Sequence, residues 1–166
     1  MENTCEGQII DVGISEKKIA KAPVKLITRG LGSCVGVTLY DPGKKTGGLA
    51  HAMLPDIDKV TTKVNPLRFV NYLIKKMVEE LENNGCIRNH LEAKLFGGAH
   101  MFGFVSSESV LNVGDKNVEM ARAVLAEMGI NILVDDTGGT FGRTITLNLE
   151  NGKVLIKTIA WGEREV

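Results

Sequence analysis

Residues 34–54, CVGVTLYDPGKKTGGLAHAML, contain the pattern on which the fold prediction depends. The first part is rich in β-branched and aromatic residues and stops at D-P-G, a strong turn signal. Residues 46–54 then return as a second strand, whose period of two places His51 on the same face as Leu49 and Met53. The stretch therefore predicts a β-hairpin that carries a histidine on one face.

Further strands and two helices are predicted outward from this hairpin. Asn65 followed by Pro66 suits a helix start, the apolar stripe after it predicts a helix, and Gly85 suits its C-terminal cap. A second helix is predicted over 114–128, and Asn151-Gly152 is a hairpin turn signal. The other predicted strands are 8–14, 23–28, 91–96, 130–135, 143–149 and 153–160.

The helices do not alternate with the strands, and most strands are linked by hairpins. This order favours an α+β fold, with mixed or antiparallel sheets and both helices on one face, over a doubly wound fold. The 166 residues contain no internal repeat and no long linker, so we expect a single domain over 1–166.

The composition excludes several classes of protein. Twenty Lys and Arg balance 20 Asp and Glu, and this zero net charge gives no field that would hold nucleic acid or an anionic membrane. Aromatic residues are only 5%, which argues against base-stacking surfaces. No apolar run approaches the roughly 18–20 residues that a bilayer span needs. Glycine is unusually frequent, at 19 residues.

The cysteines indicate a reducing compartment. Cys5, Cys34 and Cys86 are odd in number and far apart, whereas a disulfide framework needs pairs. The start of the sequence, MENTCEGQII, has neither the basic region nor the apolar stretch of a signal peptide. We therefore expect a cytoplasmic protein whose cysteines are packing residues or chemical groups.

A glycine-rich corner at 30–36 leads into the hairpin. Its sequence resembles two known motifs, but the structural context that each motif requires is not predicted here. The dinucleotide fingerprint needs a third glycine where this chain has Val35, and it needs a helix where this chain has a strand. Gly32-Ser33-Cys34-Val35-Gly36 has the sequence pattern of a nucleophile elbow with cysteine at the centre, but the sequence after it predicts a strand and not the helix that follows such an elbow. The glycines still allow close approach of the backbone and convergence of N–H groups on an oxyanion.

Two interpretations of Cys34 remain open from the residues alone: a buried packing residue, or a nucleophile at a strand edge. Ser33 is the competing nucleophile, with a turn residue as its simpler interpretation. The base would be His51, which the hairpin brings towards Cys34, although a histidine satisfied within the core remains the alternative. His100, after a glycine pair, ranks second, and His90 is interpreted as loop surface.

Metal binding is weakly supported. No two of the cysteines and histidines stand at the usual spacing of paired ligands. The run D-D-T-G-G at 135–139 is an acidic candidate, but such a run is more often a solvated strand end. We predict neither a metal nor a cofactor.

The motifs T-x-G-L-G-S-C at 28–34 and GLAHAMLP at 48–55 resemble CheD, the family of chemoreceptor glutamine deamidases of bacterial and archaeal chemotaxis. Further agreement extends over nearly the whole chain, in EAK at 92–94, GGA at 97–99, NVG at 112–114, NVE at 117–119 and DTGG at 136–139. The combination of the first motif with the histidine is specific.

The resemblance implies a layered α/β/β domain like that of toxin-type glutamine deamidases. Carried over position by position, Cys34 would be the nucleophile, His51 the general base and acid, and Thr28 the third member that orients the imidazole. The substrate and oxyanion loop would include Gly30, Gly32, Ser33, Gly97 and Gly98. The activity would convert receptor glutamines to glutamates through a Cys34 thioester with release of ammonia, with methylesterase activity as a side reaction.

The partners implied are the cytoplasmic helices of methyl-accepting chemotaxis receptors and the CheC phosphatase. A second hypothesis of another class follows from the same resemblance: a binding module whose main task is to engage the receptors and CheC, without catalysis. A thiol peptidase is a more distant alternative.

Overall fold

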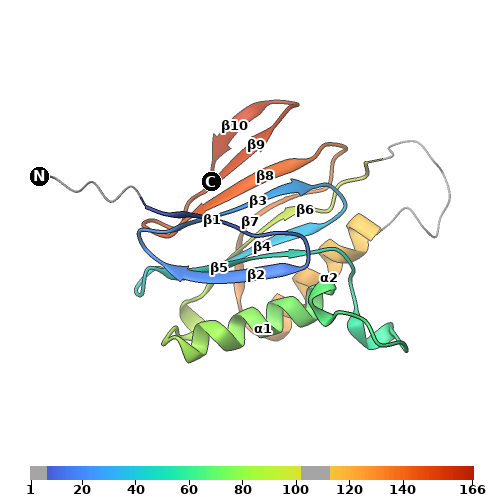
Figure 1. Cartoon of the computed structure of the whole chain (residues 1–166), viewed down its shortest axis with the longest axis horizontal. Coiled ribbons are helices and arrows are strands. Elements are labelled where there is room, and N and C mark those ends of the chain that lie inside the picture. The colour runs from blue at the N-terminus through green and yellow to red at the C-terminus, as the bar shows by residue number, and fades with distance from the viewer. Residues whose placement is uncertain (1–6, 102–112) are drawn as a thin grey trace, which may run out of the picture.

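The computed structural model describes residues 7–101 and 113–166, and within them two five-stranded sheets and two α-helices form an α+β domain. The helices α1 and α2 cover one face of a central sheet, and an outer sheet covers the other face, so the layers run helix, sheet, sheet (Figure 1). The predicted fold class, with mixed sheets and both helices on one face, is confirmed.

Both sheets are mixed, because each contains one parallel pair of strands at an edge. The outer sheet has the order β1 (Ile9–Asp11), β3 (Lys25–Leu31), β8 (Arg143–Asn148), β9 (Val154–Thr158), β10 (Gly162–Glu165). The central sheet has the order β2 (Glu16–Lys21), β5 (Thr46–Ala52), β4 (Val35–Asp41), β6 (Glu92–Gly97), β7 (Asn131–Thr137). The helices are α1 (Val70–Asn83) and α2 (Val113–Glu127), and short 3-10 turns occupy Ile57–Lys59, Pro66–Arg68 and Arg88–His90.

The predicted hairpin is the pair β4 and β5, and every residue of both strands is buried. Leu49 packs between the two sheets, whereas Ala50 and Ala52 face the helices, as the period of two requires. Gly36 lies directly opposite His51 in the register. The face that carries His51 is therefore turned towards the outer sheet.

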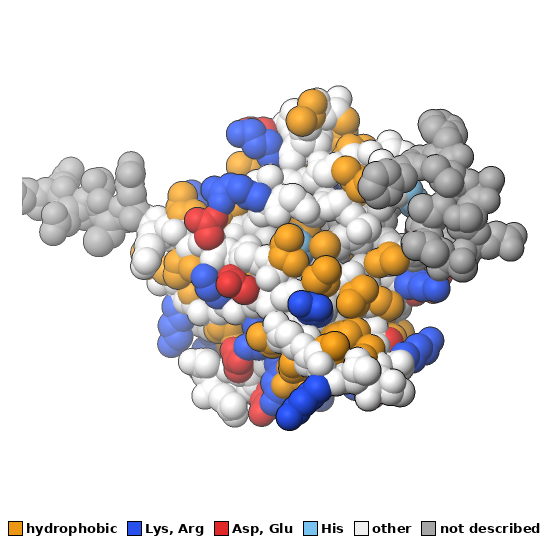
Figure 2. All heavy atoms as spheres, turned by 45° about the vertical axis from the view of Figure 1, so that its right-hand side comes forward, with side chains coloured by type: hydrophobic (Ala, Val, Ile, Leu, Met, Phe, Trp, Pro, Cys, Tyr) orange, Lys and Arg blue, Asp and Glu red, His pale blue; other side chains and the backbone are white. Residues whose placement is uncertain are grey.

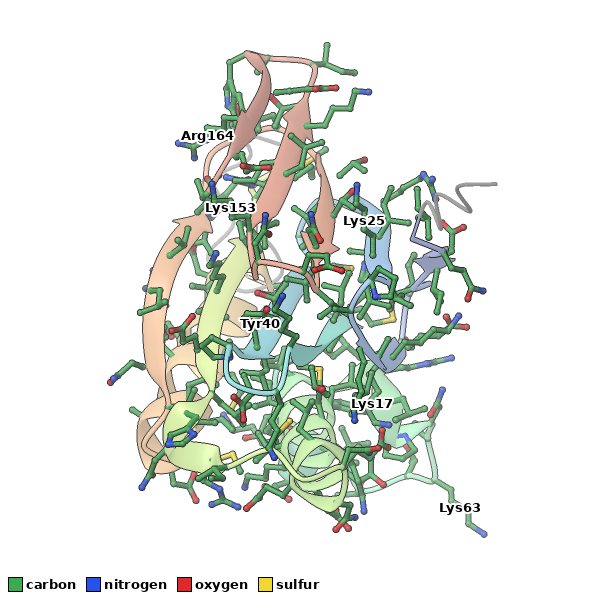
Figure 3. The ribbon with its side chains drawn as sticks, turned by 90° about the vertical axis from the view of Figure 1, so that its left-hand side faces the viewer. Lys17, Lys25, Tyr40, Lys63, Lys153 and Arg164 are labelled. Carbon is green, nitrogen blue, oxygen red and sulfur yellow. The ribbon has the colours of Figure 1, made fainter. Side chains whose placement is uncertain are left out.

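Two apolar clusters hold the layers together. One joins α1 and α2 to the central sheet through residues such as Leu73, Met77 and Leu125. The other lies between the sheets and includes Leu26, Phe96 and Ile145. Tyr40, at the end of the molecule shown in Figure 3, belongs to the second cluster, and its hydroxyl donates to the Leu149 carbonyl at 2.9 Å.

The predicted helix start is wrong by one turn. Asn65 does accept a hydrogen bond from the Leu67 N–H, but it caps the 3-10 turn Pro66–Arg68. Phe69 then has extended backbone and bridges to Leu54, so α1 begins at Val70. The end of α1 is as predicted, because Gly85 follows the Asn84 cap with a φ of 91°.

Two edge strands, β2 and β10, are absent from the prediction. Their sequences, EKKIAK and GERE, are largely charged and show no apolar alternation. They are strands because their backbones pair with β5 and β9. Charged residues are common on edge strands, where they discourage pairing with other chains.

We expect Gly36→Ala to reduce the free energy of unfolding by about 1–3 kcal/mol, because a methyl group there overpacks the space between the sheets. Its Cβ would lie 2.8 Å from Leu31 Cδ1 and 3.0 Å from Ile145 Cδ1. Urea unfolding measures the loss. The control is Gly43→Ala, whose Cβ would meet only an Asp41 carboxylate oxygen at 3.4 Å. Equal losses in the two variants would contradict the packing argument.

Candidate active site

Cys34 lies at the corner between the end of β3 and the start of β4, where the chain passes from the outer to the central sheet. Its side chain is half-buried and packs against the cluster between the sheets. Burial raises the pKa of the Cys34 thiol, and its own backbone N–H lowers that pKa by a smaller amount. At neutral pH Cys34 is therefore an uncharged thiol on a side chain that is still partly open to solvent.

Thr28 and His51 face each other across the space between the sheets, Thr28 from β3 and His51 from β5. Thr28 Oγ1 lies 2.7 Å from His51 Nδ1, and both side chains are buried. Thr28 Oγ1 also donates its single proton to the Val12 carbonyl at 2.6 Å. The hydroxyl must therefore accept from His51, which places the imidazole proton on Nδ1 and a lone pair on Nε2.

The His51 Nε2 atom is fully buried and has no hydrogen-bond partner among the described residues. Burial lowers the pKa of His51 to about 4, because a charged imidazolium loses its hydration there. At neutral pH the ring is therefore an uncharged base with an unused acceptor.

Cys34 and His51 both lie on the side of the central sheet that faces the outer sheet. Cys34 comes one residue before β4 and packs against the cluster between the sheets, and His51 pairs with Gly36 and meets Thr28 of the outer sheet. No hydrogen bond joins the Cys34 thiol to His51 in the part of the chain that the structure describes. Both groups are uncharged at neutral pH, the thiol because its pKa is raised and the imidazole because its pKa is about 4.

The carbonyl groups of Gly32, Ser33 and Cys34 all accept hydrogen bonds from the protein. The Gly32 carbonyl accepts from the Ala99 N–H and the Cys34 carbonyl from the Gly98 N–H, each at 2.8 Å. The Ser33 carbonyl accepts from Asn117 Nδ2 at 3.0 Å. The N–H groups of Ser33 and Cys34 donate to none of the described residues. These two consecutive N–H groups, next to the thiol and without an acceptor in the described chain, are candidate donors to an oxyanion.

The glycine clusters at 30–36, 97–98 and 138–142 lie together at this end of the molecule. The Gly138 N–H donates to the Gly97 carbonyl at 2.9 Å, and Gly98 binds the corner itself. Gly97 has a φ of 95°, and a Cβ there would lie 2.3 Å from the Cys34 carbonyl oxygen. Only glycine allows the β6 end to approach Cys34 so closely.

Gly30 and Gly32 have different places in the corner. Gly30 is exposed, has a φ of 71° and lies where the β3–β8 register shifts between Thr28 and Leu31. Gly32 lies against Met101, whose Cγ would be 3.0 Å from an added Cβ. Figure 2 brings this end of the molecule forward and shows hydrophobic side chains gathered on it beside scattered charges.

The competing candidates lie elsewhere or are engaged in other contacts. His100 Nε2 lies 2.9 Å from an Asp115 oxygen, and His90 is exposed in the Arg88–His90 turn. Cys86 is buried in the helix-side cluster, and Cys5 lies outside the described residues. Ser33 is partly exposed, and its hydroxyl makes no hydrogen bond to a histidine of the described chain.

The acidic run at 135–139 binds arginines. Asp135 binds Arg122, and Asp136 binds both Arg143 and Arg164. Buried Arg143 also donates to the Gly138 carbonyl at 3.1 Å, so this network supports the glycine turn beside the site. The described residues contain no group of three potential metal ligands.

Two residues at the site escaped the sequence prediction: Asn117 and Arg143. Arg143 begins β8, where an arginine usually indicates solvent. Asn117 had a weak signal, because it precedes Ala121 by four residues on the apolar face of α2. A polar residue on that face requires a hydrogen-bond partner.

Comparisons with known proteins identify the family. Residues 53–158 match the model described as CheD, chemotactic sensory transduction. A "Probable chemoreceptor glutamine deamidase CheD" of Clostridium novyi is 43% identical over 157 residues, which are 95% of this chain and 97% of the relative. Its counterpart in Desulforamulus reducens is 47% identical over 150 residues, 90% of each chain. The chain belongs to the CheD family.

A relative in an archaeon has similar coverage: the CheD 1 protein of Methanosarcina acetivorans is 45% identical over 95% of this chain and 97% of its own. Solved structures resemble the fold alone. The Bacillus licheniformis protein YfiH has a TM-score of 0.50 at 16% identity over 75% of this chain, which spans about half (51%) of YfiH. NMB0706 of Neisseria meningitidis also scores 0.50, at 10% identity over 81% of this chain and 63% of its own.

No helix of the described residues is long and apolar enough to cross a membrane.

We expect the free energy of unfolding to fall as the pH is lowered from about 6.5 to about 4, by up to about 3 kcal/mol from His51. In this window the unfolded chain binds a proton at His51 and the folded chain does not, so stability rises with pH. Above about pH 6.5 the contribution is complete. Urea unfolding across this range measures it.

His51→Gln should lose this part of the pH dependence, whereas His90→Gln, at an exposed position, should keep it. If the free energy of unfolding changed with pH as steeply in His51→Gln as in the wild type between pH 4 and pH 6.5, the conclusion that His51 is buried as a neutral imidazole would be wrong.

Proposed function

We propose that this protein is a glutamine deamidase that converts receptor glutamine side chains to glutamates, with Cys34 as nucleophile and His51 as general base. The observation that carries the proposal is the buried Thr28–His51 hydrogen bond, which leaves a free Nε2 lone pair on the face shared with Cys34. The names of its relatives support the substrate class, because they are called probable chemoreceptor glutamine deamidases.

The first step forms the tetrahedral intermediate that precedes the thioester. The Cys34 thiol proton passes to His51 Nε2 while sulfur attacks the carbon of the glutamine side-chain amide. The pKa of the thiol is raised and that of His51 is about 4, so proton transfer before attack is unfavourable. The transfer must therefore accompany formation of the C–S bond. The N–H groups of Ser33 and Cys34 receive the oxyanion that develops.

The intermediate then collapses in two stages. The C–N bond breaks as the His51 imidazolium returns its proton to the leaving nitrogen, which gives ammonia and a Cys34 thioester. Water attacks the thioester while neutral His51 accepts a proton, and the C–S bond breaks to give glutamate and the free thiol. The sum is hydrolysis of one amide, with no redox change and no cofactor.

Thr28 contributes by fixing the imidazole. Its hydroxyl accepts from Nδ1, and the Val12 carbonyl holds the hydroxyl in that orientation. The acceptor keeps Nε2 unprotonated in the resting state and stabilises the proton on Nδ1 when the ring becomes charged. The same acyl chemistry applies to a glutamyl methyl ester, so we include methylesterase activity as a side reaction.

The proposed substrate is a glutamine on the cytoplasmic helices of a methyl-accepting receptor, and the protein would act in the cytoplasm. The alternative is a binding module for receptors and a CheC phosphatase. A surface that only binds a partner does not require a buried imidazole with a fixed tautomer, so the Thr28–His51 pair favours the enzyme.

We expect Cys34→Ala to abolish deamidation of a receptor cytoplasmic fragment. The conversion adds about one dalton at each glutamine, which peptide mass spectrometry detects after incubation with the protein. Cys86→Ala is the matched control and should retain activity, because Cys86 lies in the helix-side cluster, on the other side of the central sheet. Conversion that survives Cys34→Ala would overturn the proposed nucleophile.

We expect Thr28→Val to lower kcat about 10- to 100-fold, whereas Thr28→Ser stays within a few-fold of the wild type. Valine keeps the β-branched shape but removes the acceptor for Nδ1 and the donor to Val12. Rate measurements with the same receptor fragment compare the two. Equal activity of the valine and serine variants would remove Thr28 from the mechanism.

A further inference from the structure

Asn117 connects the two chain segments that carry the proposed nucleophile and base. From the first half of α2, its Nδ2 donates to the Ser33 carbonyl at 3.0 Å and to the Met53 carbonyl at 3.2 Å. Ser33 immediately precedes Cys34, and Met53 follows His51 by two residues, just beyond β5. The Asn117 side chain is fully buried. One amide therefore fixes the end of β5 relative to the corner before β4.

The contact with Ser33 orients a peptide unit, because the carbonyl of a trans peptide and the following N–H point in opposite directions. With the Ser33 carbonyl turned towards Asn117, the Cys34 N–H is turned away from α2. That N–H donates to none of the described residues. The same N–H belongs to the residue that carries the thiol, and it lowers the pKa of that thiol.

The neighbouring carbonyls do not provide this orientation. Gly98 and Ala99 bind the carbonyls of Cys34 and Gly32, and these belong to the peptide units on either side. Within the described chain, only Asn117 binds the Ser33 carbonyl. Without this donor, a buried carbonyl loses its partner, and the peptide unit can turn to find another.

The second polar atom of Asn117, Oδ1, has no partner in the part of the chain that the structure describes. Oδ1 is buried and accepts no hydrogen bond from the described residues. Burying an acceptor without a partner costs free energy, and native proteins do so only rarely. An apolar residue at this position would avoid that cost. The amide is therefore suited to its two donor contacts rather than to general packing.

We propose that Asn117 is a positioning residue that aims the Cys34 N–H at the oxyanion of the reacting glutamine. This inference rests on the proposed function, because it requires attack by Cys34 on a carbonyl. Asn117 does not touch the substrate in this mechanism, and it acts through the Ser33–Cys34 peptide unit.

The test separates oxyanion stabilisation from nucleophilicity. Asn117→Leu should lower kcat for the receptor fragment about 100-fold, with KM changed less than about threefold, as expected for loss of an oxyanion donor. Alkylation of Cys34 by iodoacetamide should stay within about threefold of the wild type, because substitution at an alkyl iodide forms no oxyanion.

Asn71→Leu is the matched control. Asn71 is also a buried asparagine of a helix, and its Nδ2 donates to Asp56 Oδ1 at 2.9 Å, in the loop before α1. It should lose thermal stability and keep its deamidation rate. An equal fall of kcat in both leucine variants would show that the loss is general destabilisation and would overturn the inference.

Asn117→Asp keeps the shape of the side chain and provides a test even if the leucine variant does not fold. An ionised carboxylate repels the two carbonyls, whereas a protonated one donates to the Ser33 carbonyl. The ratio of variant to wild-type kcat should therefore rise as the pH is lowered. A ratio that is constant with pH, or alkylation that falls as much as kcat, would overturn the inference.

Failure of the inference and failure of the proposed function give different results. If Cys34→Ala is inactive while Asn117→Leu deamidates at nearly the wild-type rate, only the role of Asn117 is wrong. If Cys34→Ala still deamidates, the proposed nucleophile is wrong, and if the wild type leaves the receptor fragment unconverted, the proposed function itself is wrong.

Discussion

The hydrogen bond between Thr28 and His51 spans the space between the two sheets, and the proposed chemistry depends on it. Thr28 belongs to the outer sheet and His51 to the central sheet, so the bond exists only when the sheets are packed. The Val12 carbonyl takes the hydroxyl proton and thereby decides which imidazole nitrogen carries a hydrogen. Gly36 lies opposite His51 in the register. A methyl group at Gly36 would overlap Leu31 and Ile145, so this position between the sheets has room only for glycine.

Burial has opposite consequences for stability and for chemistry at this site. A fully buried imidazole is held neutral at the expense of acid stability, because protonation in the folded state is disfavoured. The same burial leaves an Nε2 lone pair without a competing donor among the described residues. Cys34 is only half-buried, so an incoming side chain can reach its sulfur. The proposed base is therefore enclosed, whereas the proposed nucleophile is partly exposed.

The glycine excess has a structural explanation at the same end of the molecule. The ends of β3, β6 and β7 meet there, and the backbone amides of Gly98, Ala99 and Gly138 bind carbonyls across the junction. Contacts between backbones at this distance leave no room for side chains, as the Gly97–Cys34 approach shows. The amides of Ala99 and Gly98 bind the carbonyls of Gly32 and Cys34, the Asn117 side chain binds that of Ser33, and the N–H groups of Ser33 and Cys34 donate to none of the described residues.

The sequence by itself determined the elements that local patterns encode: the β4–β5 hairpin with His51 on one face, the two helices, the α+β class, and Cys34 beside a glycine corner. Thr28 came only from the family resemblance, because a threonine in a strand carries no local signal of catalysis. The edge strands β2 and β10 exist through pairing alone, and the start of α1 was displaced by the bridge between Leu54 and Phe69. Asn117 and its contacts were decided by tertiary structure, since its partners lie 84 and 64 residues away. Local periodicity records which side of an element is buried, but which hydrogen-bonding groups meet there depends on how the layers pack.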